Sequence, residues 1–459
     1  MMKMTKDMTQ GNPISLILKF SIPLILGNLF QQLYNMVDTI IVGRALGLNS
    51  LTAVAATTSL NFLIVGFVLG VCSGLAIPVA QRFGAGDYKK MRNYVANAAY
   101  VAIAMALVIT VVTTGCCHVI LRWMKTPESI FAESYAYFWV ICLGIPFTFL
   151  YNTVSGIIRA LGDSRTPFYF LVISTILNIV LDLVFIITLH WGVAGAAWAT
   201  IIAQALSGFM CLIYMKKKYA ILKSTREERK LNFRAIATLL MNGVPMGLQY
   251  SITAIGTIML QSSVNVLDAV YVSAYAAATK VKQLAMAPFD GIANACSTFC
   301  SQNLGAGKLD RIRKGVKDGV GIGLVYAIAI AFVLFFAGSR IAWMFVDRSE
   351  TEVLAAVQLM LSCAAFFYPV LSILNCVRMT LQGMGFGAIA IFAGWLELAA
   401  RAMMALLVIP KFGYIAVCFT DQAAWVVAAV FVVIVFLVEM RRLEKKAEKK
   451  KGNNKCIVN

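Results

Sequence analysis

The sequence predicts an all-α polytopic membrane protein, with twelve transmembrane helices in two pseudo-symmetric lobes of six helices each. Three observations support this fold class: the composition, the spacing of apolar segments and an internal repeat. Of the 459 residues, 60% are hydrophobic and 13% are charged, and the mean hydropathy is +0.80. Because soluble domains contain about 25% charged residues, this chain is expected to lie in a membrane.

Each apolar segment has the length of about 20 residues that a helix needs to cross a bilayer. In the first half, spans are predicted near residues 17–43, 51–80, 94–120, 135–158, 166–189 and 193–215. In the second half, they are predicted near residues 235–262, 272–300, 316–338, 353–377, 387–409 and 413–438. The predicted domains are an N-terminal tail (1–13), an N-lobe (14–215), a basic linker (216–234), a C-lobe (235–440) and a basic C-terminal tail (441–459).

The basic residues indicate the orientation in the membrane. Most of the 40 Lys and Arg residues fall in the two tails and in the loops after every second span. The opposite loops contain only Arg44, Arg122, Lys125, Arg340, Arg348 and Lys411. This asymmetry is typical of the positive-inside rule and predicts that both termini are cytoplasmic. The net charge of +19 therefore indicates topology and contact with membrane lipid, and nucleic acid is not expected as a partner.

The two halves are related by a repeat. "AQRFGAG" follows the second span and "SQNLGAG" follows the eighth, so that Gln81 and Gly84 recur as Gln302 and Gly305. Nearly the same displacement aligns Pro23 with Pro245. A displacement by six helices preserves orientation, which predicts parallel lobes related by an axis along the membrane normal. Such an arrangement places a cavity between the lobes.

Several classes of enzyme are excluded by missing motifs. The sequence has no G-x-x-x-x-G-K-[ST] phosphate-binding loop and no H-E-x-x-H zinc motif. Its two histidines, His118 and His190, are both predicted near the outer surface, and its eleven cysteines include no C-x-x-C pair. We therefore expect no enzymatic activity, no resident metal and no cofactor.

Polar residues within the spans are the candidate functional residues, because a carboxylate at the centre of the bilayer costs roughly 2.5 to 3.5 kcal/mol. Ser174, Asn178 and Asp182 are spaced by four residues and share one face of the fifth span. In the first span, Asp38 follows Gln31 and Asn35 on one stripe, and Thr200 adds a hydroxyl from the sixth span.

Two carboxylates, an amide oxygen and a hydroxyl would suit a monovalent cation or a proton. Asp38, Asn178, Asp182 and Thr200 are therefore predicted to form a cation-binding site. The alternative is that Asn178 and Thr200 only hydrogen-bond neighbouring helices.

The second half carries a different set of charges. Glu397 and Arg401 are four residues apart, a spacing at which their charges neutralise each other on one helix face. That pair is either structural or part of a substrate or gating contact. Lys280, Lys282 and Gln283 either face the cavity or extend to the membrane interface. The possible substrate or gating residues are Gln31, Asn35, Asn152, Lys280, Gln283, Glu397, Arg401 and Asp421.

Four motifs together resemble the multidrug and toxic compound extrusion (MATE) family of the MOP superfamily: "IPLILGNLFQQLYNMVDTIIVGRALG", the paired Q-x-x-GAG turns, "RALGDSRTP" and "NIVLDLVFI". The resemblance covers residues 13–440. The DinF-like branch fits best, since residues 235–267 contain no Asp or Glu. The family's first-lobe cation site carries over onto Asp38, Asn178, Asp182 and Thr200.

The resemblance implies a V-shaped cavity and export of small amphipathic, often cationic, drug-like compounds in exchange for Na⁺ or H⁺. We expect a monomeric multidrug efflux antiporter in the bacterial cytoplasmic (inner) membrane, with no cofactor besides the coupling ion. One alternative is a flippase for lipid-linked precursors, which Lys280 and Lys282 would support. Another is a non-transporting receptor or scaffold, against which the buried acids and the duplicated lobes argue.

Overall fold

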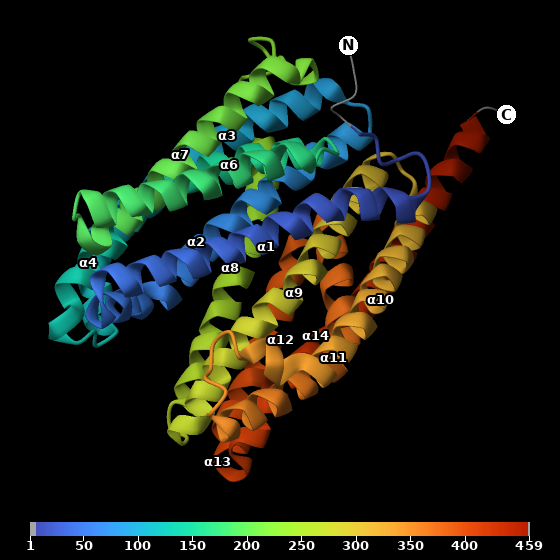
Figure 1. Ribbon diagram of the computed structural model, residues 1–459. Helices are drawn as coiled ribbons and strands as arrows, with labels where there is room; N and C mark the ends of the chain where they lie inside the picture. Colours follow the sequence, from blue (N-terminus) through green and yellow to red (C-terminus); the bar gives the residue numbers. More distant parts are fainter. Residues whose placement is uncertain (1–5, 458–459) are drawn as a thin grey trace.

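A computed structural model describes residues 6–457, and this part of the chain is helical and contains no strands (Figure 1). Residues 1–5 and 458–459 of the two predicted tails lie outside the described residues. The first half comprises α1 (Pro13–Leu46), α2 (Leu48–Gly84), α3 (Tyr88–Trp123), α4 (Glu128–Leu143), α5 (Ile145–Ala160), α6 (Arg165–Asp182), η1 (Leu183–Thr188) and α7 (Gly192–Lys218). After the short turn η2 (Ala220–Leu222), the second half comprises α8 (Phe233–Val264), α9 (Ala269–Gly305), α10 (Leu309–Ala342), α11 (Thr351–Gly383), α12 (Gly387–Met403), η3 (Met404–Val408), α13 (Ile409–Phe412) and α14 (Tyr414–Ile457).

The helices fit a membrane by length and composition. Within residues 6–457, nine helices are long and apolar enough to span a bilayer, and α4 with α5 makes a tenth span that is bent by 42°. That bend falls at Gly144, just before Pro146 in the first turn of α5, where a proline cannot donate a helical hydrogen bond. The remaining long helices, α8 and α9, have 32 and 37 residues. They are less apolar than the other ten predicted spans, and α9 carries Lys280, Lys282 and Asp290.

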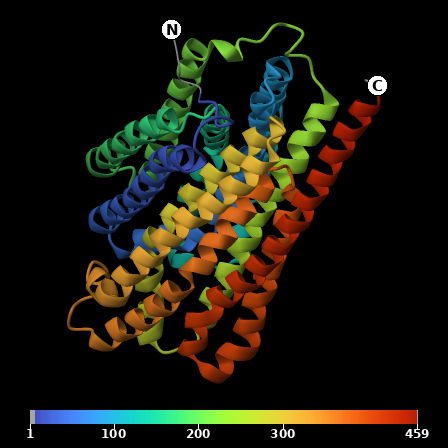
Figure 2. The same cartoon turned by 90° about the vertical axis from the view of Figure 1, so that its right-hand side faces the viewer.

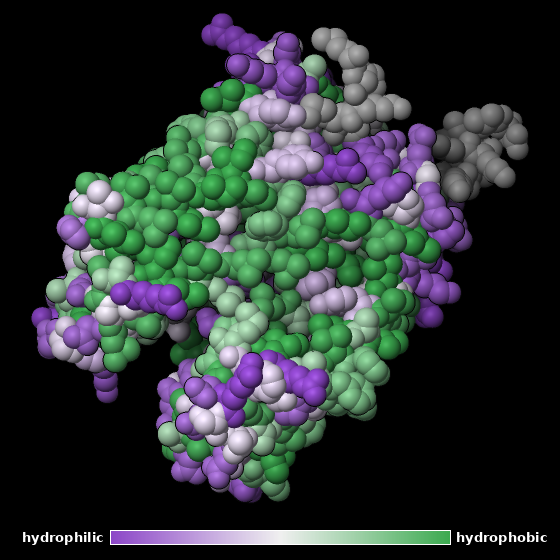
Figure 3. Space-filling model, viewed as in Figure 1, coloured by the Kyte–Doolittle hydropathy of each residue, from purple (hydrophilic) through white to green (hydrophobic). Residues whose placement is uncertain are grey.

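The helices form two lobes, α1–α7 and α8–α14, as the sequence repeat predicts. Both ends of the described chain lie at the same end of the molecule, and the lobes diverge away from that end (Figure 1). Seen from the side, α14 runs along the second lobe (Figure 2). The surface is broadly apolar between its two polar ends and is hollowed between the lobes (Figure 3).

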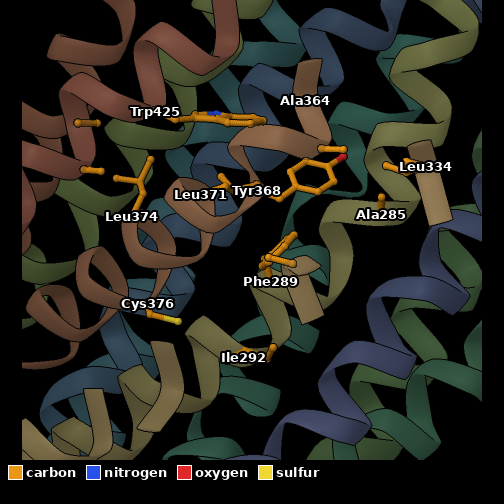
Figure 4. Packing of buried hydrophobic residues seen from close by; sticks show 14 of the residues in the cluster. Ala285, Phe289, Ile292, Leu334, Ala364, Tyr368, Leu371, Leu374, Cys376 and Trp425 are labelled. Atoms are coloured by element: carbon orange, nitrogen blue, oxygen red, sulfur yellow. The ribbon is translucent and has the colours of Figure 1, made fainter. Parts of the chain in front are cut away.

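Aromatic side chains fill the core of the second lobe. Tyr368 of α11 is fully buried, and its ring centroid lies 5.5 Å from that of Phe289 and 6.3 Å from that of Trp425 (Figure 4). These three rings tie α9, α11 and α14 together. Aromatic rings at such distances and tilted angles contribute about 0.5 to 1.5 kcal/mol per pair beyond their burial, so this part of the lobe is expected to move as a unit.

The lobes meet along a seam of glycines between α2 and α8. A Cβ atom built on Gly74 would lie 2.5 Å from the Cα of Gly243, and one built on Gly70 would lie 2.7 Å from the Cα of Gly247. Both pairs follow the G-x-x-x-G spacing that lets two membrane helices approach backbone to backbone. The seam holds the lobes together through the second half of α2 and the first half of α8.

A second contact closes the end that carries the termini. A side chain at Gly84 would overlap the carbonyl of Gln302, and one at Gly305 would overlap the carbonyl of Gln81. The side chains of these two glutamines also cross between the lobes: Gln81 donates to the Gly383 carbonyl (3.1 Å) and Gln302 donates to the carbonyl of the last α5 residue (2.9 Å). The repeated Q-x-x-G motif therefore forms a pseudo-symmetric closure.

Residues 6–12 reinforce this closure from outside the helices. The Lys6 amide donates to the Leu161 carbonyl of the first lobe (3.0 Å), and the Met8 amide donates to Gln302 Oε1 of the second (2.8 Å). Arg311 and Asn303 also donate to the Met8 carbonyl. Because Met8 is fully buried, this segment is packed between the lobes.

The linker after α7 is anchored on α3. Arg92 donates to both carboxylate oxygens of Glu228, at 2.8 and 2.6 Å. This hydrogen-bonded pair and the Thr225 amide lower the pKa of Glu228 to about 2. Asn93 donates to the Glu228 carbonyl (2.9 Å). The connection between the lobes is thus fixed to the first lobe.

Replacing Gly74 with valine is expected to separate α2 from α8 and lower the free energy of unfolding by about 3 kcal/mol, the upper end of typical overpacking costs. Thermal unfolding of the purified protein measures the change. Gly115→Val is the matched control, because a Cβ at Gly115 in α3 meets nothing within 4 Å. Equal melting temperatures for the two variants would contradict the close seam.

Candidate functional site

A cavity of about 220 Å³ opens between the lobes. Most of its wall comes from α1, α2, α5, α6 and α7, while Tyr250 of α8 and Asn294 of α9 contribute from the second lobe. The apolar part of the wall includes Leu24, Leu69 and Phe168. An apolar wall with a few polar groups is typical of a small-molecule site.

The predicted cation-binding residues lie together beside this cavity. Asn178 and Thr200 line it, and the Asn178 amide donates to Thr200 Oγ1 at 3.4 Å. Asp182 lies one turn further along α6 and is fully buried. Asp38, on α1, is partly exposed and lies within electrostatic range of Asp182. These four residues come from three helices, so their oxygen atoms form one group only because α1, α6 and α7 pack together.

Several acceptor oxygens in this group have no donor. Among the described residues, Asp38 Oδ1, Asn178 Oδ1 and both carboxylate oxygens of Asp182 are buried without a hydrogen-bond partner. A buried ionised carboxylate without a partner is strongly unfavourable. The arrangement is therefore suited to a group that supplies positive charge, either a metal cation or a proton.

Two tyrosines belong to the same group, and sequence reasoning missed both. Tyr34 and Tyr137 each lie within electrostatic range of Asp38 and Asp182. Tyr34 also lines the cavity. Its position four residues before Asp38 in the first span was a usable signal. Tyr137 of α4 has no such spacing, because only tertiary packing brings α4 beside the acids.

Both lobes interrupt an α-helix with a π-helix at matching positions. Leu183–Thr188 follows Asp182 in the first lobe, and Met404–Val408 follows Met403 in the second. Single π-helical turns occur frequently at functional sites. In the first lobe, the π-helix begins directly after the buried carboxylate, so a local change of helical winding there would move Asp182.

The second lobe contains a network of paired charges. Lys282 Nζ lies 2.6 Å from Asp421 Oδ2, and Arg401 Nε lies 3.1 Å from Asp421 Oδ1. The predicted Glu397–Arg401 pair is present, but its N–O distance is 3.6 Å. Each member has a closer partner, Asp421 for Arg401 and Arg378 for Glu397 (2.8 Å).

Arg378 extends this network and was missed by the sequence analysis. It also donates to Asn375 Oδ1 (2.8 Å), and Asn375 donates to Asp290 Oδ1 (3.2 Å). Lys282, Arg378 and Arg401 are therefore balanced by Asp290, Glu397 and Asp421. Since three cationic and three acidic side chains are connected in one network, it is suited to holding α9, α11, α12 and α14 together.

Some of the other predicted substrate or gating residues line the cavity, and the rest lie outside it. Gln31 and Asn152 line the cavity. Asn35 on α1 and both Lys280 and Gln283 on α9 are exposed and are not among the residues that line it. Lys282, which could have faced the cavity, is instead buried against Asp421.

A duplicated helical membrane protein with an internal cavity and partnerless buried carboxylates has the architecture of a membrane transporter. Comparison with known families agrees: the MatE family model matches residues 23–184 and 245–396, one match in each lobe. The chain belongs to this family and is a multi-pass MATE transporter.

Two relatives agree with this assignment, and a solved structure agrees with the fold. The chain is 30% identical to the probable multidrug resistance protein YpnP of Bacillus subtilis over 369 residues, 80% of this chain and 82% of YpnP. It is 28% identical to the probable multidrug resistance protein YoeA of the same organism, over 75% of this chain and 76% of YoeA. A crystal structure of MATE in complex with MaL6 shares the fold with a TM-score of 0.89 and 21% identity, covering 96% of this chain and 99% of that one.

Proposed function

We propose that this transporter is a secondary antiporter that exports amphipathic compounds in exchange for Na⁺ or H⁺. The observation that carries the proposal is the group of partnerless oxygens at Asp38, Asn178 and Asp182 beside the cavity. The names of YpnP and YoeA, both probable multidrug resistance proteins, support export of foreign compounds. Asp38, Asn178, Asp182 and Thr200 would bind the coupling ion.

The coupling would depend on the position of these residues at the cavity wall. A cation or proton at Asp182 removes the repulsion between Asp182 and Asp38, which allows α1 and α6 to approach. Because Asn178 lines the cavity and lies one turn from Asp182 on α6, that movement would change the substrate site. The ion must bind more tightly in one conformation than in the other, since equal affinities shift no equilibrium.

The distribution of charge supports an orientation with both termini in the cytoplasm of a bacterium. In that orientation, the closure formed by the Q-x-x-G motifs and residues 6–12 lies on the cytoplasmic side. The hollow between the lobes then faces outward (Figure 3). We propose that the monomer is the transporting unit, since the cavity and the ion group are both built within one chain.

The flippase alternative loses the residues that favoured it. Lys282 is paired with Asp421, and Lys280 does not line the cavity. A receptor or scaffold would have no need for partnerless buried acids beside a cavity.

Transport by the purified protein in liposomes tests the proposal. Uptake of a panel of fluorescent amphipathic dyes is measured while a Na⁺ gradient and a pH gradient are imposed separately. We expect one gradient to drive uptake and the dissipation of that gradient to accelerate when dye is added. A folded protein that moves no dye under either gradient would contradict antiport.

A further inference from the structure

Arg159 places a positive charge in the wall of the cavity. It lies in the last turn of α5 and lines the cavity wall. Among the described residues that line the cavity, it is the only one that carries a formal charge. Its place near a helix end gives no functional signal in the sequence, since an arginine there usually reaches the membrane interface.

Within residues 6–457, Arg159 forms no ion pair with an acid, unlike the cationic residues of the second lobe. The described groups within its electrostatic range include Tyr151 and Tyr250, with Cys72 and Cys211, and all four are uncharged side chains. By contrast, Lys282, Arg378 and Arg401 each form an ion pair in the second lobe. A cationic side chain within a membrane protein normally has a partner or faces a water-filled path. Arg159 faces the cavity, so its partner is expected to come from there.

The acids nearest to the cavity do not offset this charge. Asp38 and Asp182 are not among the residues that line the cavity, whereas Asn178 and Thr200 are. Asp290 of the second lobe belongs to the neutral network through Asn375 and Arg378. The wall that a substrate meets is therefore polar, apolar or positive.

The groups around Arg159 complete a site for an anion on an apolar molecule. Ser73 of α2 and Asn294 of α9 line both the cavity and the small pocket that adjoins it at Arg159, and each carries a side-chain hydrogen-bond donor. Leu24 and Leu69 supply apolar surface on the same wall. A guanidinium forms two parallel hydrogen bonds with a carboxylate or phosphate, which gives both affinity and orientation.

We propose that Arg159 binds an anionic group (a carboxylate, sulfonate or phosphate) of an amphipathic organic substrate. This inference rests on the proposed transport function and narrows its substrate class. It also reverses the preference for cationic compounds that the family resemblance implied. A cationic compound would have to enter a cavity whose single lining charge repels it.

Two dyes with the same xanthene core, anionic fluorescein and cationic rhodamine 123, test the proposal. Binding to the full-length protein is measured by fluorescence anisotropy, and uptake is measured in liposomes. We expect the wild type to bind fluorescein more tightly than rhodamine 123. Arg159→Gln should weaken fluorescein binding by at least about tenfold, the value of a hydrogen bond to a charged group, and should not weaken rhodamine binding. Arg159→Lys should retain part of the affinity.

Arg165→Gln is the matched control, because it removes the same charge from an exposed position at the start of α6. A wild type that prefers rhodamine 123, or an Arg159→Gln protein with unchanged fluorescein affinity, would overturn the inference. Binding that depends on Arg159 without uptake under any gradient would support the anion site and contradict the proposed antiport. Flipping of a short-chain fluorescent phosphatidic acid that depends on Arg159, without fluorescein uptake, would support the site and place its anion on a lipid.

Discussion

Asp182→Asn is expected to abolish ion-driven dye transport, with at least a hundredfold loss of initial rate, while the protein remains folded. Asparagine has the same shape as aspartate but no charge, so it binds a cation more weakly than a carboxylate does and cannot exchange a proton. Both Asp182 carboxylate oxygens are buried without a donor in the described structure. Removing an unpaired buried charge relieves desolvation, so the melting temperature should stay the same or rise.

Loss of transport without a decrease in melting temperature would distinguish a functional carboxylate from a structural one. If Asp182 only joined helices, Asp182→Asn would lower the melting temperature and leave part of the transport rate. Asp38→Asn should reproduce the loss of transport, because the two acids interact electrostatically. Asp268→Asn, at an exposed position just before α9, is the control. Full ion-dependent transport by Asp182→Asn would exclude the cation site as assigned.

Asp421→Ala is expected to destabilise the second lobe by about 3 to 5 kcal/mol, the cost of removing one partner from a buried ion pair. The substitution leaves both Lys282 and Arg401 without the carboxylate that now lies 2.6 Å and 3.1 Å from them. Water cannot reach these cations easily, since both residues are about 95% buried. Thermal unfolding in detergent should show a large decrease in melting temperature.

A compensating variant identifies the reason for that decrease. Combining Asp421→Ala with Lys282→Met removes the unpaired Lys282 charge and should restore a substantial part of the stability. Asp268→Ala, which removes an exposed carboxylate, should change the melting temperature little. If the double variant were less stable than Asp421→Ala, the pairing of Lys282 with Asp421 would not be what stabilises this network.

Much of the fold could be predicted because a bilayer limits the possible structures. A backbone in hydrocarbon must satisfy its own hydrogen bonds, so long apolar segments become helices. The predicted all-helical membrane architecture and its two related lobes are confirmed by the MatE match in both halves and by the solved MATE fold. The composition of α8 and α9 deviates most from the predicted spans, and both helices contribute polar residues to the cavity.

The candidate site could be predicted only where one helix carries the pattern. Asn178 and Asp182 share a face because they are four residues apart, and Glu397 and Arg401 follow the same rule. Tyr137 and Arg378 could not be found this way, because their partners lie on other helices. The assignment of the ion site itself remains a prediction until the aspartate variants are measured.

The membrane class, the helical segments, the repeat and the set of intramembrane acids could all be derived from the sequence alone. Each of these depends on spacing along the chain and on the free energy of placing a group in hydrocarbon. Which helix faces are in contact is seen only in the tertiary structure. Helix packing brings Lys282 beside Asp421, and it brings Gly84 and Gly305 into the contact that closes the end with the termini. It also places Arg159 in a cavity whose described lining contains no acid. Such pairings depend on distances of a few ångströms between helices, and no local pattern in the sequence encodes them.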